Sequence, residues 1–245
     1  MRERLAEGGL FCQWLPLHQL DQPTLRSIVQ SYLAAFPRGR ALLATNSLST
    51  PVIGLVSHVD GEPFVARSGA AFTVPAQAFG LPDRMSVLGS FVAGPVALAT
   101  FAKGAPWNTD DRPSVAWLAP RATYGDMPTP AARLMSLLDS WSVTPMDIAA
   151  RSADGATNAA VDARLAAYIE ARRRFIAAGL AVRPESDPER MLAQVREPLL
   201  AVLRISPDFA PAREPLQRLA QALRGRDPEA SARLERDLPP LPVEP

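Results

Sequence analysis

Cysteine and histidine are scarce in this sequence, and their scarcity excludes several kinds of site. Cys12 is the single cysteine, so neither an intrachain disulfide nor a cysteine-based zinc site can form. His18 and His58 are the only imidazoles, which leaves the usual zinc ligand sets incomplete and gives a Ser-His-Asp arrangement few options. So little cysteine is typical of a reducing compartment, and we expect a cytoplasmic location.

An excess of charge of one sign is also lacking, and so are long apolar runs. The sequence has 26 basic and 25 acidic side chains, a net charge of +1, which provides no electrostatic basis for binding nucleic acid. The segment from Met85 to Ala102 approaches the length of a membrane span, but Gly94-Pro95 interrupts it, and a pair of buried helices is expected there instead. The N-terminus does not have the pattern of a signal peptide.

The first 60 residues have an α/β pattern. The apolar run from Leu10 to Leu17 has the length of a buried strand. Asp21 is a candidate N-cap, and apolar residues at helical spacing follow it until Pro37. Apolar runs at 41–45 and 51–56 predict an antiparallel hairpin. The order strand, helix, strand, strand favours the closing end of a doubly wound, Rossmann-type sheet with an antiparallel edge hairpin.

The next segment is rich in proline, glycine and small residues. Short helices are expected around 75–78 and 83–101, and an irregular stretch over 107–121. Asp110-Asp111 could in principle grip an amine or a metal ion. Adjacent side chains on an extended chain point to opposite sides, however, so a turn capped by Thr109 is favoured.

Beyond residue 128 the pattern is mostly helical, with helices predicted over 130–141, 159–180, 188–205, 211–224 and 228–238. The turn Pro207-Asp208-Phe209 and the small residues after it resemble a tetratricopeptide repeat, with about one and a half units recognisable; an ordinary helical bundle fits equally well. The predicted fold is therefore α/β to mostly α. Its predicted parts are a Rossmann-type end (1–60), an extension with short helices (61–127), a helical, TPR-like region (128–238) and a proline-rich tail (239–245).

The segment from Arg2 to Val56, RERLAEGGLFCQWLPLHQLDQPTLRSIVQSYLAAFPRGRALLATNSLSTPVIGLV, resembles the late part of the spermidine synthase-like proteins. It is most similar to the bacterial branch in which that domain is fused behind a membrane transporter-like half. The segment NTDDRPSVAWLAPR, Asn108 to Arg121, is similar to a recurrent segment near the end of these domains. The resemblance implies a methyltransferase-like sheet, of which Arg2 to Val56 is the last parallel strand, its helix and the edge hairpin. It also implies a parent protein attached to the inner membrane.

The activity implied by the resemblance is polyamine biosynthesis: an aminopropyl group passes from decarboxylated S-adenosylmethionine to an amine such as putrescine, without a metal. The family uses a glycine-rich loop, an acidic residue on the ribose and aspartates near the fourth strand, and all of these precede the strand that opens this chain. No GxGxxG pattern occurs in the sequence. We therefore expect the C-terminal portion of such an enzyme, inactive alone, without cofactor-binding, catalytic or metal-binding residues. Its expected partners are the missing N-terminal half of the enzyme or a second copy of the chain.

Three residues are candidates for contact with an amine substrate. Gln13 matches a glutamine of the family's fifth-strand motif, and Trp14 would lie near the same end of the strand. Phe36 stands where spermidine synthases often have a tyrosine before a proline, and the missing hydroxyl puts putrescine specificity in doubt. Packing in the core or at the sheet edge is the alternative for these residues. The alternative for the whole chain is a scaffold whose stacked helices bind a peptide.

Overall fold

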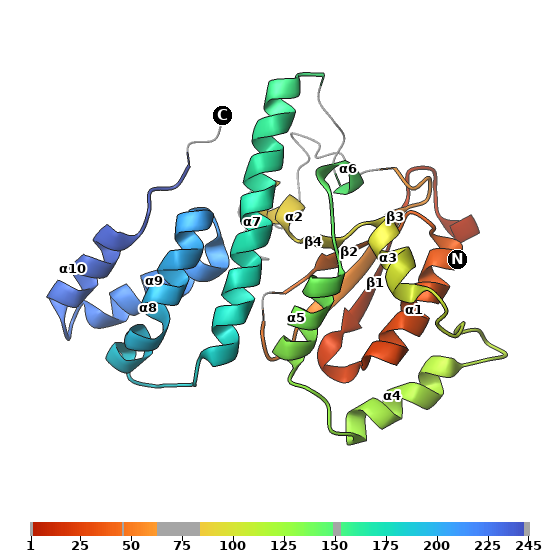
Figure 1. Ribbon diagram of the computed structural model, residues 1–245, viewed down its shortest axis with the longest axis horizontal. Helices are drawn as coiled ribbons and strands as arrows, with labels where there is room; N and C mark the ends of the chain where they lie inside the picture. Colours follow the sequence, from red (N-terminus) through yellow and green to blue (C-terminus); the bar gives the residue numbers. More distant parts are fainter. Residues whose placement is uncertain (1, 46, 63–83, 149–152, 243–245) are drawn as a thin grey trace. The chain divides into compact units, whose positions relative to one another are not determined.

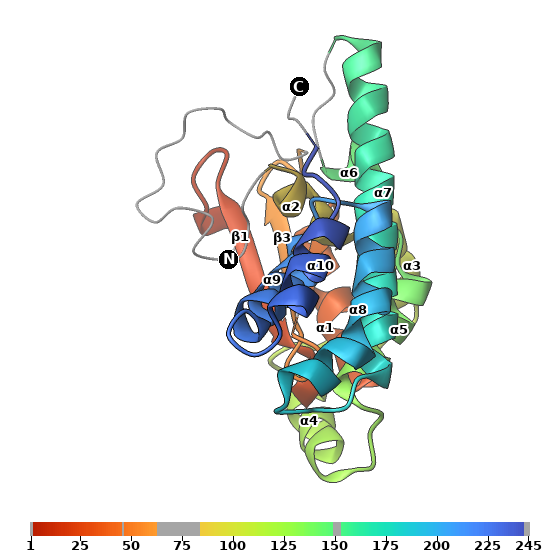
Figure 2. The same cartoon turned by 90° about the vertical axis from the view of Figure 1, so that its left-hand side faces the viewer.

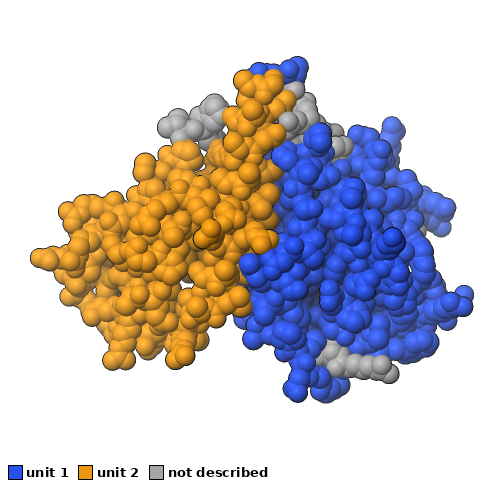
Figure 3. All heavy atoms as spheres, in the orientation of Figure 1, with its two compact units in different colours: residues 1–71, 87–154 blue, residues 72–86, 155–245 orange. Residues whose placement is uncertain are grey.

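The computed structural model describes residues 2–45, 47–62, 84–148 and 153–242 (Figure 1). The chain divides into two compact units, residues 1–71 with 87–154 and residues 72–86 with 155–245 (Figure 3). The first unit combines a sheet with short helices, and the second consists of longer helices, so the fold is mixed α/β leaning to α. The domain boundaries expected at residues 60, 127 and 238 stay predictions.

The described sheet has four strands, β1 (Leu10–Pro16), β2 (Arg40–Leu43), β3 (Val52–His58) and β4 (Phe91–Ala93). Their order is β1-β3-β2-β4, and each neighbouring pair is antiparallel. The predicted hairpin is confirmed, since β2 pairs antiparallel with β3. Its expected place at the sheet edge is wrong, because β3 lies between β1 and β2, and β4 extends the sheet beyond β2. Ile53 and Leu55 are buried on one face of β3 and Val56 on the other, which suits that strand to an interior position.

Strand β1 lies at an edge of this sheet and is less buried than predicted. Leu15 is buried, whereas Leu10 and Trp14 are 48% and 58% exposed. Trp14 pairs across the sheet with Gly54, and its ring covers that glycine. A Cβ atom on Gly54 would lie 2.9 Å from the tryptophan ring, so glycine leaves the space that the ring occupies. A short 3-10 helix, η1 (Arg2–Arg4), precedes the strand.

The connection from β1 to β2 contains a 3-10 turn, η2 (Leu17–Gln19), and helix α1 (Gln22–Ala35). Asp21 caps α1 as predicted, because its carboxylate accepts a hydrogen bond from the Thr24 N–H at 2.9 Å. The helix packs on the sheet through stacked aromatic rings: Phe11 of β1 lies 6.0 Å from Tyr32 and 5.1 Å from Phe36 between ring centres.

Helix α2 (Arg84–Gly89) precedes strand β4. Four helices of the first unit follow that strand: α3 (Pro95–Ala102), α4 (Ser114–Tyr124), α5 (Pro130–Ser140) and α6 (Pro145–Ile148). The prediction of two buried helices over 85–102 is wrong in one respect. Strand β4 lies between the helices α2 and α3 and pairs with β2. None of the helices in the described ranges has the length and apolarity needed to cross a membrane.

The prediction of an irregular stretch over 107–121 is wrong from Ser114 onwards, because helix α4 begins there. Pro120 lies inside this helix at an exposed position and does not end it. The predicted turn before it is confirmed, since the backbones of Thr109 and Arg112 exchange hydrogen bonds of 3.0 and 3.1 Å. The helix predicted at 75–78 lies outside the described residues.

The second unit contains the helices α7 (Gly155–Ala181), α8 (Pro188–Ile205), α9 (Ala210–Leu223) and α10 (Pro228–Asp237), close to the predicted bounds. Each packs against the next (Figures 1 and 2). Phe209, in the turn between α8 and α9, is fully buried and meets Tyr168 of α7 edge to face at 4.9 Å. Asp208 accepts hydrogen bonds from Arg164 of α7, which fastens the same turn to the long helix.

Candidate functional site

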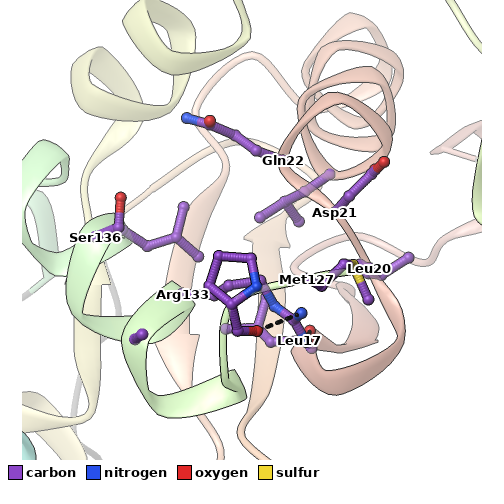
Figure 4. A pocket seen from close by; sticks show the side chains of 11 residues that line it. Leu17, Leu20, Asp21, Gln22, Met127, Arg133 and Ser136 are labelled. Carbon is purple, nitrogen blue, oxygen red and sulfur yellow. Dashed lines mark hydrogen bonds between the residues drawn. The ribbon is translucent and has the colours of Figure 1, made fainter. Parts of the chain in front are cut away.

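A cavity of about 250 Å³ lies in the first unit where β1 ends (Figure 4). Its walls come from η2, the first turn of α1, the residues before α5 and the first turns of α5. The apolar part of the lining consists of Leu17, Leu20, Leu25, Met127, Pro128, Ala132 and Leu137. Asp21, Gln22, Arg133 and Ser136 are the polar residues of the lining. Pockets for drug-sized ligands start at about 300 Å³. This cavity is slightly smaller, so its volume suits a smaller molecule.

Arg133 of α5 holds this cavity in shape. Its guanidinium donates one hydrogen bond to the Leu17 carbonyl at 2.8 Å and another to the Pro128 carbonyl at 2.9 Å. These bonds join the end of β1 to the loop before α5. Figure 4 draws a hydrogen bond of this guanidinium as a dashed line. Burial lowers the pKa of Arg133, and the nearby Asp21 carboxylate partly opposes that shift. The Nε of Arg133 is buried and has no acceptor within the described residues.

The N-terminus of α1 forms the opposite wall. Asp21 uses Oδ1 to cap the Thr24 N–H, as described above, so part of this carboxylate is already committed to the helix. The side chain of Gln22 is exposed at the cavity rim. The cavity thus combines apolar walls with one carboxylate and one guanidinium, an arrangement that can orient a small, largely apolar molecule through one polar end.

The residues predicted from the sequence do not line this cavity. Gln13 and Trp14 are consecutive in β1 and therefore point to opposite faces of the sheet. Gln13 is half-buried on the face that Phe11 shares with α1, and Trp14 is exposed on the other face. Phe36 is buried between Phe11 and Tyr32. Contact of these residues with a substrate stays a prediction, and packing is the role that their surroundings support.

Sequence reasoning missed Arg133 and identified Asp21 only as a helix cap. Arg133 lies 116 residues from Leu17, and nothing in the surrounding sequence marks it as different from other helical arginines. A signal was available for Asp21, because a capping residue directly after a strand places a helix N-terminus at the carboxyl end of that strand. In the described ranges, no group of three or more histidine, cysteine, aspartate or glutamate side chains could hold a metal ion.

Comparison with known proteins adds no relative: no protein-family model, no characterised protein and no solved structure matches this chain.

Proposed function

We propose that the first unit is the closing part of a Rossmann-type, methyltransferase-like sheet in a spermidine synthase-like aminopropyltransferase. The direction of the strands carries this proposal. β1 and β2 are both antiparallel to β3, so they run in the same direction and α1 connects them. A strand, a helix and an antiparallel hairpin is the order that the resemblance implies for the end of such a sheet.

The position of the cavity supports the same proposal. Open α/β sheets bind their ligands beyond the carboxyl ends of their strands. The cavity begins at Leu17, directly after the last residue of β1. In an aminopropyltransferase-like protein, this chain would contribute the side of the site that receives the amine, and a nucleoside-binding half would contribute the glycine-rich loop that this sequence lacks.

The chemistry of the cavity is compatible with an amine that attacks in its neutral form. Displacement at a sulfonium centre requires an unprotonated amine held in line with the bond that breaks. The apolar walls suit a methylene chain, and they disfavour the protonated form of an amine because burial away from water disfavours charge.

Calorimetry and an activity assay test the proposal. The chain alone is expected neither to bind decarboxylated S-adenosylmethionine nor to transfer an aminopropyl group to putrescine. Co-expression with a half that carries the glycine-rich loop and the acidic strand ends is expected to restore both, and Arg133→Met should then weaken transfer more than nucleoside binding. Nucleoside binding by the chain alone would contradict the assignment of that role to another half.

The second unit supports a second candidate function, a helical scaffold that binds peptides. Successive helices α8, α9 and α10 are joined by short turns, and Ala212 and Ala220 are buried in α9. Small buried residues let paired helices approach closely, as in repeat proteins, which use such stacks to bind extended peptides. A peptide array probed with the full chain tests this function, and binding no stronger than to scrambled sequences would contradict it.

A further inference from the structure

The outer edge of β1 presents backbone groups that have no partner among the described residues. The Leu17 N–H donates to the Pro51 carbonyl and the Val59 N–H to the Gly9 carbonyl, both at 2.9 Å. In an antiparallel pair, residues bonded to the neighbouring strand alternate with residues that face away from it. The odd-numbered residues of β1 therefore bond to β3, and Leu10, Cys12 and Trp14 direct their N–H and C=O groups outward. In the described part of the chain, no strand pairs with this edge.

The same edge lacks the features that commonly prevent strands from pairing with another chain. The strand LFCQWLP contains no charged residue, and its one proline, Pro16, stands at its end. Leu10, Cys12 and Trp14 share one face of the strand, and the two large apolar side chains among them are about half exposed.

We propose that a second copy of this chain pairs with this edge, antiparallel and centred on Cys12. In that register, Cys12 lies opposite Cys12 of the second copy, and Leu10 lies opposite Trp14. Each free N–H of one strand then meets a free C=O of the other. The exposed side chains also match, because each Leu10 packs against the Trp14 ring on the same face of the extended sheet.

Neighbouring registers match less well. A shift of two residues in one direction places Leu10 opposite Pro16, whose missing N–H leaves the Leu10 C=O without a donor, and it separates Leu10 from the Trp14 ring. A shift in the other direction places Trp14 opposite Gly8, which lies outside the strand in a turn with a φ of +66°. Like any antiparallel pairing of two identical strands, the centred register is two-fold symmetric, so it closes a dimer and leaves no further edge of this strand.

This inference does not depend on the proposed function. A nucleoside-binding half, where present, would compete for the same edge of β1. Loss of the dimer on adding such a half would support both proposals, whereas a dimer without any aminopropyl transfer would leave only this one.

Light scattering after gel filtration and cysteine cross-linking test the pairing on the full chain. The expected mass is twice the chain mass of 26.4 kDa. Opposed residues in such a pair have Cα atoms about 5.5 Å apart, within the range of about 4.4–6.8 Å for disulfides, so mild oxidation should convert most of the dimer to a covalent species. Cys12→Ser should abolish the covalent species and keep the dimer mass. Trp14→Lys should halve the mass, and its circular dichroism melt shows whether the variant remains folded.

A matched variant tests the register. Gln13→Cys in the Cys12→Ser background should not cross-link, because residues 13 of the two copies would be about 8 Å apart. Efficient cross-linking at position 13 would overturn the register, since the two-residue shift places those positions opposite each other. A monomer at all concentrations, or a dimer that Cys12 does not cross-link, would overturn the proposed interface.

Discussion

Replacement of Phe209 by alanine should destabilise the second unit selectively. Phe209 is fully buried, and the centre of its ring lies 4.9 Å from that of Tyr168 and 5.6 Å from that of Phe175. Removing a buried phenylalanine costs about 3–5 kcal/mol, of which aromatic pairs contribute about 0.5–1.5 kcal/mol each. The free energy of unfolding falls by about 2 kcal/mol for each M of urea. The urea concentration at the midpoint of unfolding should therefore fall by about 2 M.

The distribution of tryptophan allows the two units to be followed separately. All four tryptophans, Trp14, Trp107, Trp117 and Trp141, belong to the first unit. Their fluorescence reports on the sheet unit, whereas far-UV circular dichroism is dominated by the longer helices of the second unit. Phe209→Ala should therefore lower the midpoint seen by circular dichroism and leave the fluorescence midpoint within error.

A conservative control separates the loss of volume from other effects. Phe209→Leu keeps most of the buried volume but loses both ring contacts, so it should cost about 1–3 kcal/mol, less than Phe209→Ala. A circular dichroism midpoint that falls by less than about 0.5 M in Phe209→Ala would refute the assigned role of this ring in the core. An equal fall in the fluorescence midpoint would show instead that the two units unfold together.

Three further changes affect the sheet unit and are measured by tryptophan fluorescence during urea unfolding. Asp21→Ala removes the cap on the Thr24 N–H and should cost about 1 kcal/mol, while Asp21→Asn should restore most of it. Gly54→Val places a side chain against the ring of Trp14 and should cost about 1–3 kcal/mol, and an unchanged emission maximum would argue against that contact. Burial raises the pKa of Tyr32, so the unfolded phenol, with its ordinary pKa of about 10, loses its proton first. Stability should therefore be independent of this group below about pH 10 and fall above it, and Tyr32→Phe should reduce that fall.

Local sequence signals determined the helices of the second unit. Asp187 and Asp227 precede Pro188 and Pro228, and in each case the aspartate caps a helix that begins at the proline. A cap and a proline in the first turn act on neighbouring backbone groups, so the start of a helix is legible without knowing what it packs against. The cap at Asp21 was predictable for the same reason.

Sequence signals were misleading where a neighbouring element decides the structure. The apolar run of β1 predicted burial, but burial depends on how many strands flank it, and only β3 does so in the described residues. Helix α4 forms despite Pro120, because that proline lies on an exposed side and the helix packs against α1. The strand β4 is three residues long and is defined by its pairing with β2 more than by its own composition.

Helix starts, the hairpin and the excluded kinds of metal site could be predicted, because those properties depend on residue types and on near neighbours in the chain. The middle position of β3 in the sheet, the contact of the Trp14 ring with Gly54 and the cavity that Arg133 closes at the end of β1 depend on the tertiary structure. These features join segments far apart in the chain, as the 116 residues between Arg133 and Leu17 show. The free energy of such contacts depends on packing, which no local pattern encodes.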